Sequence, residues 1–218
     1  MFNITIIFSM HLNINNNSKI LYDIIEKENP EIIFEEIDIS RTEDEYYKNG
    51  PYRYQNFSSV ETIAIMNYLE NHHIKHIPVD TYEVTSIPND IYSKISNNSI
   101  EYSNLVKMNH ILSSQYGFPY INSNECSDIL EKINEMEENI VKNINDNILT
   151  NSYNSWKLIA DNRDNEMLKN IYNYSKNHSY NKAIFIVGAD HKKSIIDKIK
   201  ECDINETIKL NWKTWRIA

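Results

Sequence analysis

The sequence predicts a single α/β domain over residues 1–218, built on a mainly parallel central sheet with flanking helices. Short β-branched runs alternate along the chain with amphipathic segments, and right-handed crossovers place a helix between successive parallel strands. A chain of 218 residues is long enough for one substantial core and too short for two ordinary domains. Its composition, with 41% hydrophobic and 24% charged residues, is that of a folded protein.

The first half of the chain contains three predicted strands, at residues 3–8, 31–36 and 76–80. An amphipathic helix with apolar residues at helical spacing lies between the first two strands, and Pro30 ends it. A charged, tyrosine-rich loop at residues 40–57 leads to a second helix, for which Ser58 and Ser59 are candidate N-caps. This repeated order of strand, loop and helix favours a parallel sheet.

The second half is predicted to be mostly helical before the chain returns to the sheet. Residues 82–150 form this helical part, and the periodicity is weakest over residues 82–120, where Pro and Gly punctuate the sequence. One long helix is predicted over residues 128–149, and another begins at residues 162–167. The remaining predicted elements are a strand at residues 182–187, a helix at 193–200 and a strand at 207–210.

Charge and composition exclude several classes of function. The net charge of −9 provides no basic surface for phosphate backbones or anionic lipid, so neither nucleic acid nor a membrane is an expected partner. The apolar start, residues 4–10, is too short to span a bilayer and lacks a basic region before it. The two cysteines lie far apart, which argues against a disulfide framework and predicts a cytoplasmic location.

Motif composition narrows the chemistry further. With only three glycines, the chain has no Gly-rich phosphate cradle. It also has no Gly-x-Ser-x-Gly elbow, so a serine hydrolase of the usual α/β kind has no candidate nucleophile. His72 and His76 have the i,i+4 spacing of a metal-binding pair, but they straddle a predicted helix–strand junction, and we expect them to be structural.

Charged residues follow several of the predicted strands. His11, Glu35, Glu36, Asp80 and His191 all come just after a strand. Ligands of parallel sheets bind outside the carboxyl ends of the strands, so these side chains are expected to converge there. Glu35 and Glu36 point to opposite faces if their strand continues, and one of them is expected to face the site.

Two histidines and a carboxylate at such an edge suggest two kinds of site. Imidazole nitrogen and carboxylate oxygen both bind divalent ions, so His11, Glu36 and His191 are predicted catalytic residues and ligands of Zn, Mn or Co. The same groups could instead hold a water molecule for general-base attack without a metal. For His11 and His191 to share either site, we expect their side chains to lie within about 10 Å, the spacing across one intervening strand.

Arg163 completes the predicted catalytic set, because a guanidinium at the start of a helix could bind a substrate carboxylate or a developing anion. We expect it to contact a glutamate of the cleft. The alternative is a surface ion pair with Asp161 or Glu166. The predicted substrate-binding residues are Glu35, Glu61, Asp80 and Tyr52. For Glu61, a favourable interaction with the helix dipole is the plainer interpretation.

Short motifs that span most of the chain resemble the TraB/Tiki and erythromycin-esterase/ChaN-like superfamily. They are Ser9-Met-His11, Pro30-Glu-Ile-Ile-Phe-Glu-Glu36, the helix with Glu61, Ile77-Pro-Val-Asp80, Arg163-Asp164 and Gly188-Ala-Asp-His191. The resemblance implies an EreA/ChaN-like α/β fold with a histidine and glutamate cleft. Members of this group include metal-dependent proteases, esterases acting on macrolides and a haem-binding protein. Tiki-type members have Gly-x-x-His at both ends, and here Phe8 stands where the first glycine would be.

The sequence therefore predicts a hydrolase of a small-molecule or peptide-like substrate, assisted by a divalent metal or by a general base. A non-catalytic protein that binds haem or another ligand in the same cleft is the second hypothesis. A scaffold whose acidic surface binds a protein partner is the third.

Overall fold

A five-stranded, fully parallel sheet forms the centre of the protein, as the sequence predicts. The computed structural model describes residues 2–10, 17–39, 59–81 and 88–216. The strand order is β3-β2-β4-β1-β5, so every connection between strands that pair is a crossover. The strands are β1 (Phe2–Ser9), β2 (Ile32–Asp38), β3 (Lys75–Asp80), β4 (Lys182–Gly188) and β5 (Leu210–Thr214).

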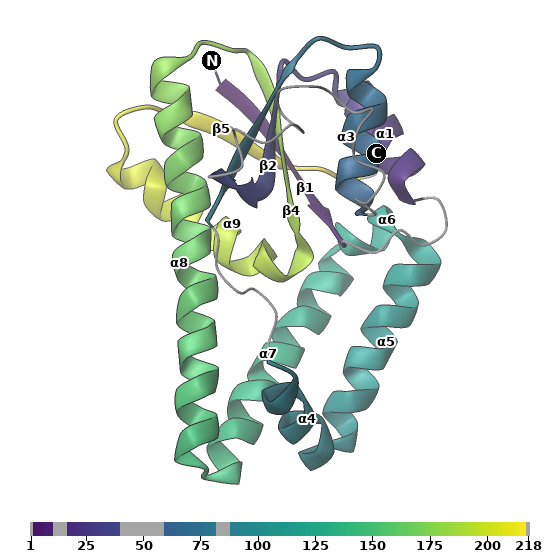
Figure 1. Cartoon of the computed structure of the whole chain (residues 1–218), viewed down its shortest axis with the longest axis vertical. Coiled ribbons are helices and arrows are strands. Elements are labelled where there is room, and N and C mark those ends of the chain that lie inside the picture. Colours follow the sequence, from purple (N-terminus) through teal and green to yellow (C-terminus); the bar gives the residue numbers. More distant parts are fainter. Residues whose placement is uncertain (1, 11–16, 40–58, 82–87, 217–218) are drawn as a thin grey trace.

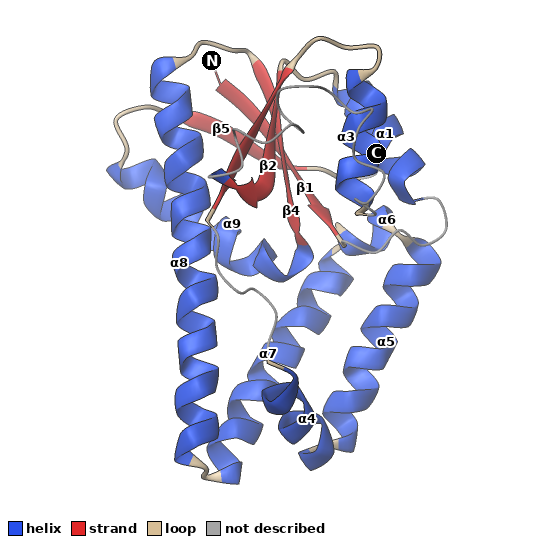
Figure 2. Ribbon diagram, viewed as in Figure 1, coloured by secondary structure: helices blue, strands red, loops and turns tan. Residues whose placement is uncertain are grey.

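Helices cover both faces of the sheet (Figure 2). They are α1 (Asn17–Glu28), α3 (Val60–Leu69), α4 (Asn89–Asn98), α5 (Ile100–Tyr116), α6 (Phe118–Ile121), α7 (Asn124–Ile144), α8 (Asn147–Asn177) and α9 (Lys192–Asn205), with a 3-10 turn η3 (Ala189–His191) after β4. On one face α1 and α3 pack against Ile33, Ile184 and Ile186 of the sheet. On the other, α8 and α9 pack against residues that include Phe34 and Phe185. Alternate side chains of β1, β2 and β4 thus supply two separate cores.

A helical bundle extends beyond the carboxyl ends of β1 and β4 (Figure 1). It consists of α4, α5, α7 and the first part of α8, and it has its own apolar core. That core includes Ile95, Val141 and Leu149, all of which are buried. None of the helices in the described part of the chain is long and apolar enough to cross a membrane.

The helix α8 differs from the prediction in a way that matters for the site. It is one continuous helix of 31 residues, whereas the sequence predicted that a helix ended at Leu149 and that another began near residue 162. The break lies earlier, at Asn145, which has a left-handed backbone with φ of 53°. Asp146 then caps α8 by accepting hydrogen bonds from the amides of Ile148 and Leu149. Arg163 therefore lies in the middle of a long helix.

The last strand also differs, since β5 covers Leu210–Thr214 rather than residues 207–210. It pairs with β1 only as far as Ile6, and the amide of Trp215 donates to the Ile6 carbonyl. Beyond Ile6, the side chain of Asn122 makes the hydrogen bonds to β1 that a neighbouring strand would make. Its Oδ1 accepts from the Phe8 amide at 3.0 Å, and its Nδ2 donates to the Phe8 carbonyl at 2.9 Å. This pairing holds the carboxyl end of β1 next to the bundle.

Candidate active site at the carboxyl edge of the sheet

A buried ion network lies where the bundle meets the sheet. At its centre is Arg163 of α8, whose side chain is only 3% exposed. Its Nε donates to Asp80 Oδ1 at 3.1 Å, and its Nη2 donates to Asp80 Oδ2 and, at 2.9 Å, to Glu36 Oε1. Asp80 ends β3 and Glu36 lies in β2, so Arg163 ties α8 to two strands. Its guanidinium is committed to carboxylates of the protein itself.

His191 joins the network from the turn after β4. Its Nδ1 lies 2.5 Å from Asp164 Oδ1, and its Nε2 lies 3.2 Å from Glu36 Oε1. Burial lowers the pKa of His191, but hydrogen bonds to Asp164 and Glu36 outweigh burial and raise the pKa to about 10. The imidazole is therefore protonated at neutral pH, with both N–H groups directed at carboxylates. The approach of Arg163 Nη1 to Nε2, at 3.4 Å, then joins two donors and is not a hydrogen bond.

Glu36 links these groups to the sheet. Its Oε1 faces Arg163 and His191, and its Oε2 accepts a 2.6 Å hydrogen bond from the Gly188 amide at the end of β4. Asp80 is held by the Thr81 amide at 2.8 Å. Burial raises the pKa of Asp80, and the hydrogen bond with Arg163 opposes that rise.

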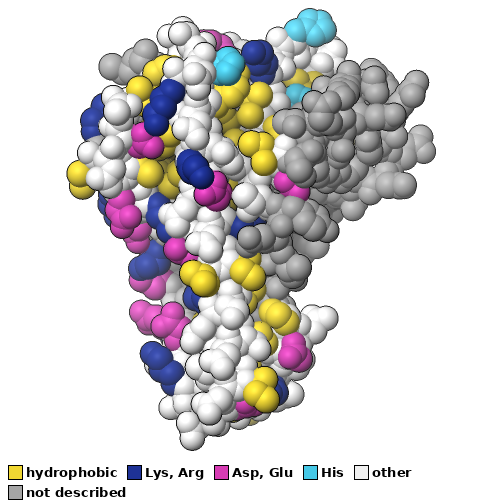
Figure 3. All heavy atoms as spheres, turned by 60° about the vertical axis from the view of Figure 1, so that its left-hand side comes forward, with side chains coloured by type: hydrophobic (Ala, Val, Ile, Leu, Met, Phe, Trp, Pro, Cys, Tyr) yellow, Lys and Arg dark blue, Asp and Glu magenta, His cyan; other side chains and the backbone are white. Residues whose placement is uncertain are grey.

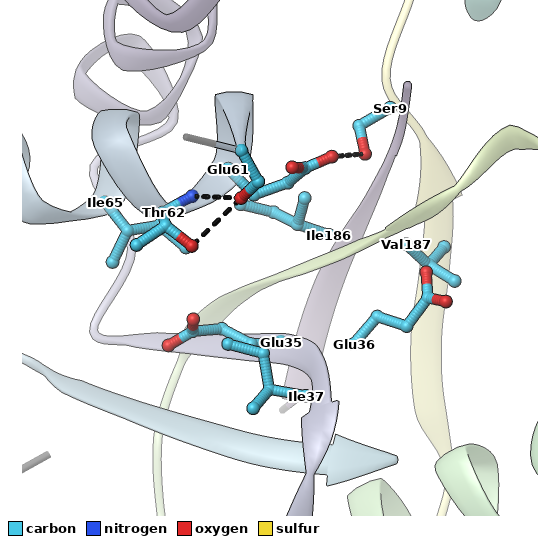
Figure 4. A pocket seen from close by; sticks show the side chains of 10 residues that line it. Ser9, Glu35, Glu36, Ile37, Glu61, Thr62, Ile65, Ile186 and Val187 are labelled. Carbon is cyan, nitrogen blue, oxygen red and sulfur yellow. Dashed lines mark hydrogen bonds between the residues drawn. The ribbon is translucent and has the colours of Figure 1, made fainter. Parts of the chain in front are cut away.

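A small cavity of about 50 Å³ adjoins the network, between the sheet and the start of α3. It is lined by Ser9, Glu35, Glu36, Ile37, Ser59, Glu61, Thr62, Ile65, Ile186 and Val187. Figure 4 shows Ser9 and Glu61 facing each other, with the Ser9 hydroxyl donating to Glu61 Oε1. Ser59 caps α3 by accepting from the Thr62 amide. The cavity has room for a water molecule or for the reacting end of a substrate.

Glu35 and Glu36 point to opposite faces of β2, as the period of a strand predicts. Glu35 faces the side of α1 and α3, where its Oε1 lies 2.6 Å from His76 Nδ1. Both glutamates nevertheless line the cavity, because it lies at the end of the sheet. The sequence predicts that at most one of the two faces the site, whereas both of them line the cavity. His76, which we expected to be structural, holds Glu35 at the cavity wall.

The structure brings together most of the predicted site residues. Glu35, Glu36, Glu61, Asp80, Arg163 and His191 all belong to the network or line the cavity. The predicted contact between Arg163 and a cleft glutamate is present. His11 and Tyr52 lie outside the described residues, and so does the predicted approach of His11 to His191.

The prediction that Arg163 begins a helix was wrong, because α8 starts at Asn147. The alternative interpretation, a surface ion pair with Asp161 or Glu166, does not hold either, since the buried Arg163 pairs with Asp80 and Glu36. Asp161 and Glu166 instead bind Lys198 and Lys169 on the exposed side of α8, at 2.7 and 2.9 Å. Figure 3 shows this side, where basic and acidic side chains are interspersed. Residues 162–167 resemble a helix start because five of the six, Asn162 to Glu166, are polar. Two of these five, Arg163 and Asp164, are nevertheless buried.

Sequence reasoning missed Asp164 as a site residue. Asp164 follows Arg163 directly and is also buried, at 2% exposure. The sequence signal that could have identified Asp164 is its position directly after Arg163 in the Arg163-Asp164 motif. The hydroxyl of Ser9 was missed as well, because it stands outside any nucleophile motif.

His11, one of the three predicted metal ligands, lies outside the described residues, and the metal site stays a prediction. Within those residues, no group of three or more His, Cys, Asp or Glu side chains is arranged to hold one. Two of the predicted ligands, Glu36 and His191, are engaged with each other, and the Arg163 guanidinium lies against both. A protonated imidazole has no lone pair left for a metal ion.

Comparisons with protein-family models, with curated proteins and with solved structures found no match.

Proposed function

We propose that the carboxyl edge of the sheet is the active site of a hydrolase that cleaves an ester or amide bond by general acid–base catalysis. The substrate is a small molecule or a peptide-like chain. The observation that carries the proposal is the buried network of Arg163, His191, Glu36, Asp80 and Asp164 beside a cavity with further carboxylates. Buried ion pairs contribute little net stability, whereas buried groups with strongly shifted pKa values concentrate at functional sites.

The roles follow from the hydrogen bonds of each group. Glu61 is the general base, because its carboxylate lies in the cavity and already accepts a hydrogen bond from a hydroxyl. His191 carries a proton at neutral pH and directs both N–H groups at Asp164 and Glu36, so it acts as a fixed positive charge. Arg163 is a positioning residue here, because its hydrogen bonds go to Asp80 and Glu36. This assignment replaces the expectation that Arg163 binds the substrate.

The resemblance of the strand-end motifs to the TraB/Tiki and erythromycin-esterase/ChaN-like superfamily supports hydrolysis among the possible reactions. It also raises the metal-assisted alternative with Zn, Mn or Co, and the alternative of a haem-binding protein. The mechanism that we propose uses the described residues, among which no group of three or more His, Cys, Asp or Glu side chains is arranged to hold a metal.

The experiment is a hydrolysis assay at pH 7 with a panel of chromogenic esters and fluorogenic dipeptide amides. We expect the wild type to hydrolyse at least one substrate and Glu61→Gln to lower kcat/KM by about 10² to 10⁴, the usual contribution of a general base. The matched control is Glu166→Gln, on an exposed glutamate of α8 that binds Lys169. It should leave kcat/KM unchanged.

Three outcomes would reject the proposal. The first is a wild type that hydrolyses nothing, and the second is a Glu61→Gln variant as active as the control. The third is activity that EDTA abolishes and Zn, Mn or Co restores, which would establish the metal-assisted reaction instead. A Soret band in the purified protein together with no turnover would favour haem binding.

A further inference from the structure

One hydroxyl of the cavity is placed differently from the others. Ser9 is the last residue of β1, and its Oγ donates to Glu61 Oε1 across the cavity (Figure 4). The other two hydroxyls, of Ser59 and Thr62, are bonded to each other at 2.9 Å, and Ser59 also caps α3. Among these three hydroxyls, that of Ser9 donates to a carboxylate.

We propose that Ser9 is the nucleophile of this site and that Glu61 activates it, an inference that rests on the proposed hydrolase function. A serine hydroxyl is a weak nucleophile unless a base within hydrogen-bond distance takes its proton, and Glu61 is in that position. The absence of a Gly-x-Ser-x-Gly elbow does not argue against this arrangement. A nucleophile and its base are defined by their geometry, and the same arrangement recurs on unrelated folds.

The reaction uses water as its second substrate and passes through an acyl ester of Ser9. Ser9 Oγ attacks the carbonyl carbon of the substrate while its proton passes to the Glu61 carboxylate. The tetrahedral intermediate collapses, and the alcohol or amine leaves with the proton from Glu61. Water then attacks the acyl-Ser9 ester, again giving a proton to Glu61, and the acid product leaves as Ser9 regains its hydrogen.

The first turn of α3 is placed to stabilise the negative charge that develops on the carbonyl oxygen of the substrate. Ser59, Glu61 and Thr62 line the cavity, so the first turn of this ten-residue helix borders the place where the oxyanion would form. The Thr62 amide is capped by Ser59, and the helix dipole is positive at this end, which favours negative charge nearby. A fixed positive dipole next to a developing oxyanion stabilises the transition state.

The test uses a fluorophosphonate probe, which reacts with activated serines, on the whole purified protein. We expect one adduct per chain by intact mass, located on Ser9 by peptide mapping. Ser9→Ala should lose the adduct, and Glu61→Gln should slow its formation at least tenfold. The matched control Ser59→Ala removes another hydroxyl from the same cavity and should keep the adduct. Circular dichroism verifies that each variant is folded.

The ester and amide panel, run in parallel, separates this inference from the proposed function. Turnover with an adduct on Ser9 supports both. Turnover without an adduct, or with an adduct on another residue, overturns the role of Ser9 and leaves the hydrolase standing. An adduct that still forms on another serine of Ser9→Ala also overturns it. The absence of both turnover and adduct overturns the two together.

Discussion

Two cations and three carboxylates lie buried beside one another at the end of the sheet. Arg163 and His191 face Glu36, Asp80 and Asp164, and each side chain is at most 10% exposed. Moving such charges out of water is costly, and removing one of them leaves the others without compensation. The residues of this network are therefore coupled to folding as well as to the catalysis that we propose.

His191 makes this coupling measurable through pH. Its pKa rises from 6.5 to about 10 on folding, so the folded protein holds a proton that the unfolded chain releases. The stabilisation is fully present below about pH 6.5 and is lost as the pH rises towards 10. We expect His191→Gln to be less stable than the wild type at pH 6.5, on the order of 3 kcal/mol, with the difference shrinking at pH 10.

Urea unfolding of both proteins at pH 6.5, 8 and 10 measures that difference. The control is His178→Gln, on an exposed histidine at the end of α8 that bonds to the Tyr174 carbonyl. Its difference from the wild type should stay small and constant. A constant difference for His191→Gln would contradict the protonated state that we assign.

The sequence predicted which residues meet and that Arg163 contacts a glutamate of the cleft. It did not predict the pairs of Arg163 with Asp80 and of His191 with Asp164. Glu36 and His191 follow β-branched runs, and parallel strands bring such positions to one edge. The partners of Arg163 depend on where α8 lies against β3, which no local pattern encodes. Asp164 was missed for the same reason, because its burial is a property of that packing.

Among the elements, β1 depends on one side chain, that of Asn122, to complete the backbone hydrogen bonds of its edge beyond the end of β5. Asn122 satisfies both the amide and the carbonyl of Phe8 beyond the end of β5. Asn122→Ala would leave both groups buried without partners, and we expect a loss of about 2 to 4 kcal/mol in the free energy of unfolding.

Thermal and urea unfolding measure this loss. Asn177→Ala serves as the control, because its amide donates to a carbonyl at an exposed position of α8. It should change stability by less than about 0.5 kcal/mol. Equal effects of the two variants would show that the amide of Asn122 does not complete the strand.

The helical bundle contains a buried carboxylate of its own. Glu137 of α7 accepts hydrogen bonds from the hydroxyls of Tyr102 at 2.7 Å and Tyr153 at 3.4 Å. Burial raises its pKa, and the hydrogen bond from Tyr102 and the charge of Lys157 oppose that rise. An acid whose pKa is raised on folding takes up a proton, so the bundle should lose stability as the pH rises above about 4.3.

Glu137→Gln keeps the acceptor and removes the charge. We expect it to be more stable than the wild type at pH 8, on the order of 1 kcal/mol, and closer to it at pH 5. Urea midpoints at the two pH values measure this, with Glu138→Gln as the exposed neighbour for comparison. If Glu137→Gln were less stable at pH 8, the ionised carboxylate would be contributing to the bundle.

The elements themselves were predicted unevenly. The strands of the sheet are marked by β-branched runs, and all five were expected, although β5 was placed a few residues early. The join between α7 and α8 was not expected at Asn145, because this residue adopts a left-handed backbone in a sequence that otherwise continues a helix. Asparagine occurs both within helices and at their ends, so composition alone does not locate such a break.

At the scale of the whole molecule, the site joins groups from both faces of the sheet. Glu61 and Ser9 lie on the side of α3, and His191 and Arg163 lie on the side of α8. Glu36 connects them, since it lines the cavity and also binds Arg163. We infer that these groups act as one catalytic unit.

A double-mutant cycle on kcat/KM tests whether they do. The variants are Glu61→Gln, His191→Gln and the double variant, each assayed on the best substrate of the panel under conditions where all are folded. Each single variant should lose about 10²-fold or more. Residues that act as a unit are strongly non-additive, so the double variant should lose little more than the worse single variant. A double variant whose loss equals the product of the two single losses would contradict a single site.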